Sequence, residues 1–182
     1  MIQAFNTLKA KAKIALMTIL GERLLSLLEE DQVIFKWISN AFSDVWSWLE
    51  NEGFTSDDFY QKYLKNQVVE NIGAYQNNKA KREAFLSQLD ILYFVCREIA
   101  IIRLIRKQRK ASAPFPADIA ETEDGDILLE RIIETALKIM KDTTQEKTWQ
   151  EQLINQLKKD FYTEDENEIG EPITREYFEE FL

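Results

Sequence analysis

The chain has 182 residues and a net charge of −9, and 45% of its residues are hydrophobic and 12% aromatic, a composition typical of a folded globular protein. It contains no histidine and one cysteine, Cys96, so this chain cannot form a histidine-dependent catalytic triad, a histidine-liganded zinc site or an intrachain disulfide. Its five glycines are scattered, which excludes the glycine-rich loops that bind phosphates and dinucleotides.

The first part of the chain predicts two amphipathic helices, because apolar residues recur three and four positions apart. The first covers about residues 4–29 and the second about residues 32–52, with Gly53 as the expected stop. A short apolar run at residues 14–20 follows several lysines, but it lacks a signal-peptide cleavage site and is too short to span a membrane. We therefore expect a cytoplasmic protein that does not enter membranes.

A short third helix and a long fourth helix follow. Thr55 and Asp58 have the spacing of a capping box, in which two residues cap each other's main chain at the start of a helix. The fourth helix, about residues 79–110, is apolar around most of its circumference between Phe85 and Ile102. A helix of this kind is buried on all sides, so we expect the other helices to pack around it.

Pro114 and Pro116 interrupt the helical pattern and predict a loop at about residues 111–125. A fifth helix follows, and a second capping-box pattern, at Thr143 and Glu146, opens a sixth. An acidic loop then precedes a short last helix. The sequence thus predicts an all-α fold.

We expect one domain over residues 1–182, a bundle of about six to seven helices around a long central apolar helix, with an acidic C-terminal helical part. Residues 1–117 carry a net charge of +3 and residues 118–182 a net charge of −12. A basic run ends the fourth helix, where cations are favoured by the helix dipole. Because the acidic protein repels phosphate, we expect no nucleic-acid binding, and we expect the run to pair with the acidic C-terminal third. Its members are Arg103, Arg106, Lys107, Arg109 and Lys110.

Acidic residues cluster at positions 57–58, 121–124 and 164–166. Helical metal-dependent nucleotide hydrolases place such carboxylates on facing helices, pointing inward. Here most of the acids fall in expected loops or outer turns, where they are solvated or form a surface that docks a basic protein. We therefore expect no metal site.

Trp46 and Trp48 are two positions apart, so they point in different directions from the second helix. Trp48 shares the apolar stripe of Val45 and Leu49 and is expected in the core. For Trp46, two interpretations stay open: packing against a second layer of helices, or exposure in a binding patch.

Residues 45–50 (Val-Trp-Ser-Trp-Leu-Glu), followed by residues 55–60 (Thr-Ser-Asp-Asp-Phe-Tyr), resemble a motif of one family of immunity proteins from bacterial polymorphic toxin systems, the sixth class in their numbering. Residues 116–121 are similar to that family's proline, acid, aliphatic and glutamate segment. The resemblance covers about residues 30–135. It implies an all-α protein, encoded beside a secreted toxin, that binds the toxin in the producing cell and inhibits it by occlusion without any chemistry.

We therefore expect a bacterial immunity protein that binds and neutralises a cognate toxin, with no enzymatic activity and no cofactor. A metal-dependent all-α nucleotide hydrolase and a helical regulatory adaptor remain as alternatives. The acidity is consistent with a basic toxin such as a nuclease, since opposite potentials accelerate encounter. The expected partner-binding residues are a tryptophan of the second helix and acids near the third helix and the loop: Trp46, Asp57, Asp58, Asp118, Glu121, Glu123 and Asp124.

Overall fold

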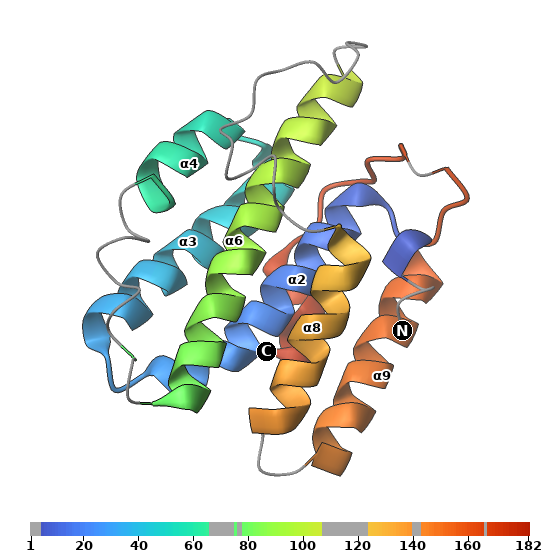
Figure 1. Cartoon of the computed structure of the whole chain (residues 1–182). Helices are drawn as coiled ribbons and strands as arrows, with labels where there is room; N and C mark the ends of the chain where they lie inside the picture. The colour runs from blue at the N-terminus through green and yellow to red at the C-terminus, as the bar shows by residue number, and fades with distance from the viewer. Residues whose placement is uncertain (1–4, 66–74, 76–77, 107–123, 140–142, 166) are drawn as a thin grey trace.

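The computed structural model describes residues 5–65, 75, 78–106, 124–139, 143–165 and 167–182. Within these residues the chain is an all-α bundle, as predicted, and the only β-type pairing is an isolated bridge between Leu8 and Tyr162. Figure 1 shows the bundle. Its elements are α2 (Ala10–Leu25), the 3-10 helix η1 (Ser26–Leu28), α3 (Gln32–Asn51), α4 (Ser56–Tyr63), α6 (Lys79–Arg106), α8 (Gly125–Ile139), α9 (Thr143–Phe161) and the 3-10 helix η2 (Arg175–Phe181).

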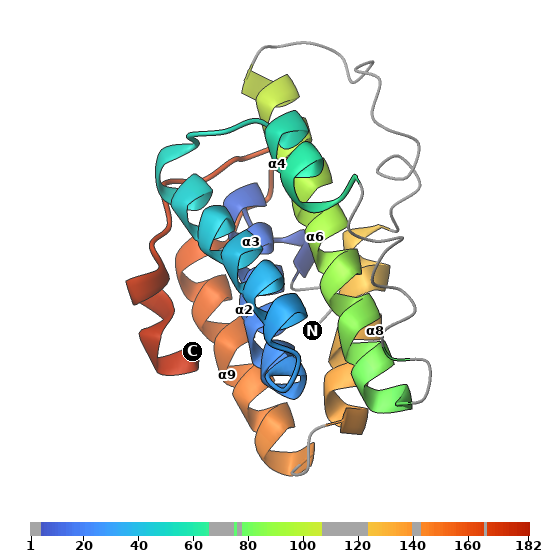
Figure 2. The same ribbon diagram turned by 90° about the vertical axis from the view of Figure 1, so that its left-hand side faces the viewer.

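Two helices share the centre of the bundle. α6 contacts α2, α3, α4 and α8, and most of its apolar residues between Phe85 and Ile102 are buried in the core, which confirms the predicted central helix. α2 is even more enclosed, because 13 of its 16 residues are buried and it contacts α3, α6, α8 and α9. Figures 1 and 2 show these helices arranged around α2. The cysteine, Cys96, is fully buried in α6, as expected of a small apolar side chain.

The start of α2 differs from the prediction, since the helix begins at Ala10 and not near residue 4. The first N–H groups of any helix lack partners inside that helix. Here the N–H groups of residues 9–11 donate to the carbonyls of Phe161, Glu168 and Ile169, at 2.9–3.0 Å. The position where α2 begins is therefore set by residues about 150 positions further along the chain.

The end of α3 also differs in detail. The helix ends at Asn51, and Glu52, not Gly53, adopts the left-handed conformation, with φ of 51°. This conformation is unfavourable for a residue other than glycine. The Glu52 carboxylate is held by two cations, Lys11 at 2.7 Å and Arg106 at 2.6 Å, which stabilise the turn.

The two predicted capping boxes have different outcomes. At α4 the box is confirmed: the Asp58 N–H donates to Thr55 Oγ1 at 3.2 Å, and the Thr55 N–H donates to the Asp58 carboxylate at 2.8 Å. Near the start of α9, Glu146 is buried instead, and its carboxylate accepts from Arg23 Nε at 3.0 Å and from Gln150 Nε2 at 2.9 Å. The predicted box at Thr143 is therefore replaced by a tertiary contact between α9 and α2.

The predicted pairing of the basic run with the acidic C-terminal third is wrong for the residues that the structure describes. Arg106 pairs with Glu52, and Arg103 lies at the hollow beside Asp58. The other three members, Lys107, Arg109 and Lys110, lie outside the described residues, as do residues 111–123 of the predicted loop.

The C-terminal segment, residues 167–182, instead runs across α2 and α3. Its Ile173 N–H donates to the Leu49 carbonyl at 3.3 Å, and Arg175 forms an ion pair with Glu22 at 3.3 Å. The segment thereby closes one side of the bundle with η2.

None of the described helices is long and apolar enough to cross a membrane.

Candidate partner-binding surface

The acids expected at the third helix lie in the first turn of α4, where negative charge is favoured by the helix dipole. Asp57 and Asp58 are both exposed. Asp58 also has a structural task, because hydrogen bonds from Thr55 to its carboxylate hold the pKa of Asp58 below its ordinary value. Because Asp58 is engaged in the cap of α4, Asp57 is the better candidate for contact with a partner.

Of the acids expected in the loop, Asp118, Glu121 and Glu123 lie outside the described residues. Asp124 is exposed just before α8, and its main-chain carbonyl accepts from the Leu128 N–H at 3.0 Å. It borders a hollow that also contains the cations Lys13 and Arg97.

The structure does not bring the described acids together in one patch. The hollow beside Asp58 is lined by Ile99 and Ile102 of α6, whereas the hollow beside Asp124 is lined by Ile101 and Ile105 of the same helix. With 100° of rotation per residue, these two faces of α6 are roughly a third of a turn apart. The predicted acidic surface is therefore divided between two sides of α6.

Trp46 is buried, with 3% of its surface exposed, so the structure shows the first of its two interpretations. Its ring packs against Phe178 of η2, with 6.0 Å between ring centroids, and its Nε1 donates to Glu22 at 3.3 Å. η2 is thus the second layer against which Trp46 packs. Trp48 is also buried, as predicted, and its Nε1 donates to the Phe54 carbonyl at 3.1 Å.

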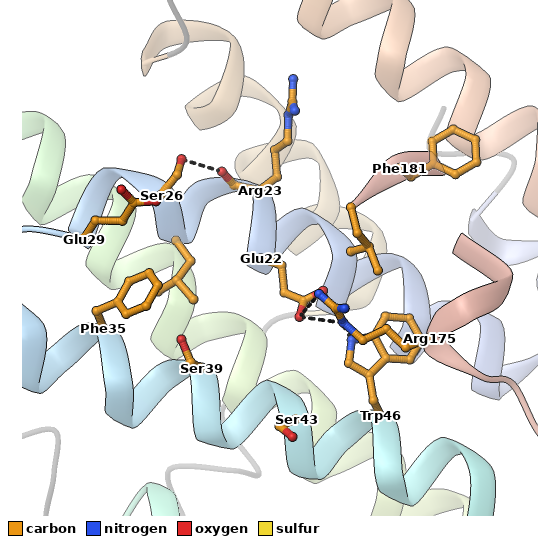
Figure 3. A pocket seen from close by; sticks show the side chains of 12 residues that line it. Glu22, Arg23, Ser26, Glu29, Phe35, Ser39, Ser43, Trp46, Arg175 and Phe181 are labelled. Atoms are coloured by element: carbon orange, nitrogen blue, oxygen red, sulfur yellow. Dashed lines mark hydrogen bonds and ion pairs between the residues drawn. The ribbon is translucent and has the colours of Figure 1, made fainter. Parts of the chain in front are cut away.

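Trp46 forms part of the wall of a groove of about 590 Å³ between α2–η1, α3 and η2. Figure 3 shows this groove, with the Glu22 carboxylate directed toward both Trp46 and Arg175. It is lined by Glu22, Arg23, Leu25, Ser26, Glu29, Phe35, Ser39, Ser43, Trp46, Arg175, Phe181 and Leu182.

The walls of the groove follow helical spacing. Phe35, Ser39 and Ser43 are four positions apart and so share one face of α3. On the opposite wall, Glu22, Ser26 and Glu29 recur at spacings of four and three along α2 and η1. Small serines on both walls leave room between the helices, which helps to explain the groove at this position.

Glu22 has an unusual electrostatic position, because its side chain is only 19% exposed. Burial raises the pKa of this carboxyl above its ordinary value, while Arg175 and the indole N–H of Trp46 act in the opposite direction. Arg175 Nε and Nη2 lie 3.4 and 3.3 Å from Glu22 Oε1. The groove thus contains a partly buried carboxylate whose hydrogen bonds are all long.

Arg23, the second cation of the groove, is directed at α9. Its Nε donates to the buried Glu146, and its guanidinium lies over the ring of Trp149, 4.6 Å from the centroid. The guanidinium of Arg23 is therefore paired on the α9 side and is directed away from Glu22 and Glu29.

The groove contains fewer carboxylates than the alternative function, a metal-dependent nucleotide hydrolase, would require. It contains two carboxylates, those of Glu22 and Glu29, and three or more would be needed to hold the divalent ions of such an enzyme. Across the part of the chain that the structure describes, no three cysteine, aspartate or glutamate side chains are grouped so that they could hold a metal ion.

The family model described as immunity protein Imm6 matches residues 12–139, and the chain belongs to this family of immunity proteins. The resemblance seen in the tryptophan motif is thereby confirmed. No curated protein and no solved structure matches the chain.

The matched range extends from α2 to α8 and includes Glu22 and Trp46, whereas α9 and the C-terminal segment lie beyond it. Sequence reasoning missed the groove because its walls come from three separate parts of the chain. Glu22 and Arg175 are 153 positions apart, and neither residue stands in a motif that links it to the other. The available signal was the serine spacing on α3, which leaves a polar strip beside Trp46.

Proposed function

We propose that the protein binds a cognate toxin and neutralises it by covering the toxin's active surface, without catalysing a reaction. Membership in the Imm6 immunity family carries this proposal. The fold supports it, since the bundle offers broad helical faces for contact. The net charge of −9 supports a basic partner, for which we propose a nuclease.

The toxin encoded beside the gene for this protein provides the test. We expect cells that express this toxin to survive only when the immunity protein is co-expressed, and the two purified proteins to form a stoichiometric complex. Excess toxin should restore killing in proportion, because occlusion consumes one inhibitor for each toxin. Protection by much less inhibitor than toxin would indicate turnover and would contradict the proposal.

We propose that the predicted acids contribute to the overall negative potential of the protein. They are the described Asp57, Asp58 and Asp124, together with Asp118, Glu121 and Glu123, which lie outside the described residues. Electrostatic steering depends on the summed field and does not need a single patch. Exposed charges are screened beyond a Debye length of about 8 Å at physiological ionic strength, so association with a basic toxin should slow as salt rises.

Reversing Asp57 and Asp124 together to lysine should lower the association rate with the toxin at least a few-fold at low salt. Tm should fall slightly, because a cation at position 57 is disfavoured by the dipole of α4. Asp58 is left intact because it caps α4. The measurement is surface-binding kinetics at low and high salt, with the double asparagine variant as the control of intermediate effect. An association rate that responds neither to salt nor to the reversals would contradict electrostatic steering.

A further inference from the structure

We propose that the groove between α2–η1, α3 and η2 is a docking site for a basic side chain of the toxin, and that Glu22 accepts this side chain in place of Arg175. The inference rests on the proposed function, because it names the chemistry that one part of the interface recognises. The occupant is a lysine or arginine on the toxin surface.

The first observation is that the present contacts of Glu22 are long. Its carboxylate lies 3.3–3.4 Å from its donors on Arg175 and Trp46. Elsewhere in the molecule, Glu52 and Asp44 lie 2.6–2.7 Å from their cations. Charge-assisted hydrogen bonds are normally about 2.7–2.9 Å long. Glu22 is thus a partly buried hydrogen-bond acceptor whose donors lie further away than in a normal charge-assisted hydrogen bond.

The second observation concerns the residue that now faces Glu22. The Arg175 side chain is 53% exposed and comes from η2, beyond the range that the family model matches, whereas Glu22 lies within it. Because the long contacts of Arg175 to Glu22 lie beside solvent, an intermolecular cation can replace them. Arg175 occupies the position that a partner's guanidinium or ammonium group would take.

The third observation concerns the charged groups that line the groove, which are two carboxylates and two guanidinium groups. Once Arg175 moves away, two carboxylates, Glu22 and Glu29, face the groove, while Arg23 is engaged by Glu146 and Trp149. Ser39 and Ser43 add hydroxyl oxygens that can accept hydrogen bonds. The volume of about 590 Å³ lies within the range of sites that enclose ligands larger than one side chain.

Two substitutions that remove the same internal ion pair test the proposal. Glu22→Gln should weaken toxin binding by at least about tenfold, because the toxin's cation loses its acceptor in a partly desolvated site. Arg175→Gln should leave the affinity unchanged or raise it up to about tenfold, because the internal competitor is removed. Both variants lose the Glu22–Arg175 pair, but Arg175→Gln also leaves the partly buried Glu22 carboxylate without its cation, so its Tm should be the lower of the two.

The outcomes separate this inference from the proposed function. If the unmodified protein forms no complex with the neighbouring toxin, the proposed function fails and this inference fails with it. If the complex forms and both substitutions weaken it equally, the ion pair is structural and the groove is not the docking site. If the complex forms and neither substitution changes its affinity, the toxin binds elsewhere and only this inference is overturned.

The indole N–H of Trp46 gives a direct signal, since it donates to Glu22. In a proton–nitrogen NMR spectrum, toxin binding should move the Trp46 indole resonance and leave that of Trp48, which donates to the Phe54 carbonyl, nearly unchanged. A complex in which the Trp46 resonance stays in place would contradict the displacement of Arg175.

Discussion

Replacement of Leu92 by alanine should lower the free energy of unfolding by about 2–5 kcal/mol, the range for large-to-small substitutions in protein cores. Leu92 is fully buried in the middle of α6, which contacts α2, α3, α4 and α8. The substitution removes apolar contacts and leaves a cavity that the surrounding helices fill only in part. Chemical denaturation monitored by circular dichroism provides the measurement.

Leu86→Ala is the matched control, because Leu86 lies on the same helix but is 39% exposed. It should cost clearly less than Leu92→Ala, since less apolar surface is removed and solvent fills the space. Equal effects at the two positions would contradict the central place of α6 in the core.

Replacement of Arg23 by alanine should destabilise the protein by about 3–5 kcal/mol, because it leaves a buried carboxylate without its cation. Glu146 is 1% exposed, and Arg23 lies 3.0 Å from its carboxylate. The substitution also removes the cation–π contact with Trp149, which adds to the loss. The effect should appear as a lower midpoint of chemical denaturation.

A second substitution identifies why the loss of Arg23 destabilises the protein. In the double variant Arg23→Ala, Glu146→Gln, the total loss should be smaller than the sum of the single losses, because the uncompensated charge is absent. Lys138→Ala serves as the control for an exposed pair, since Lys138 and Glu134 are both more than half exposed and their pair contributes about 0.3–0.5 kcal/mol. Additive losses in the double variant would mean that Arg23 stabilises α9 through packing and not through charge.

The sequence by itself determined most of the local structure. The periods of three and four in apolar residues predicted the described helices, because helix formation depends on neighbours within one or two turns. The Thr55–Asp58 box predicted the start of α4 correctly, since both partners lie within the same turn. The breadth of the apolar surface of α6 predicted its burial, and the tryptophan motif indicated the immunity family.

Only the tertiary structure decided the features that join distant parts of the chain. α2 begins where carbonyls beyond residue 160 satisfy its first N–H groups, and Glu146 turns to Arg23 and not to Thr143. Trp46 is buried because η2 packs over it. Such contacts leave no periodic signal, since a pairing across more than a hundred residues depends on how whole helices pack. For the same reason the predicted acids, chosen by their places along the chain, fell on different faces of α6, while the groove beside Glu22 appeared only when three segments came together.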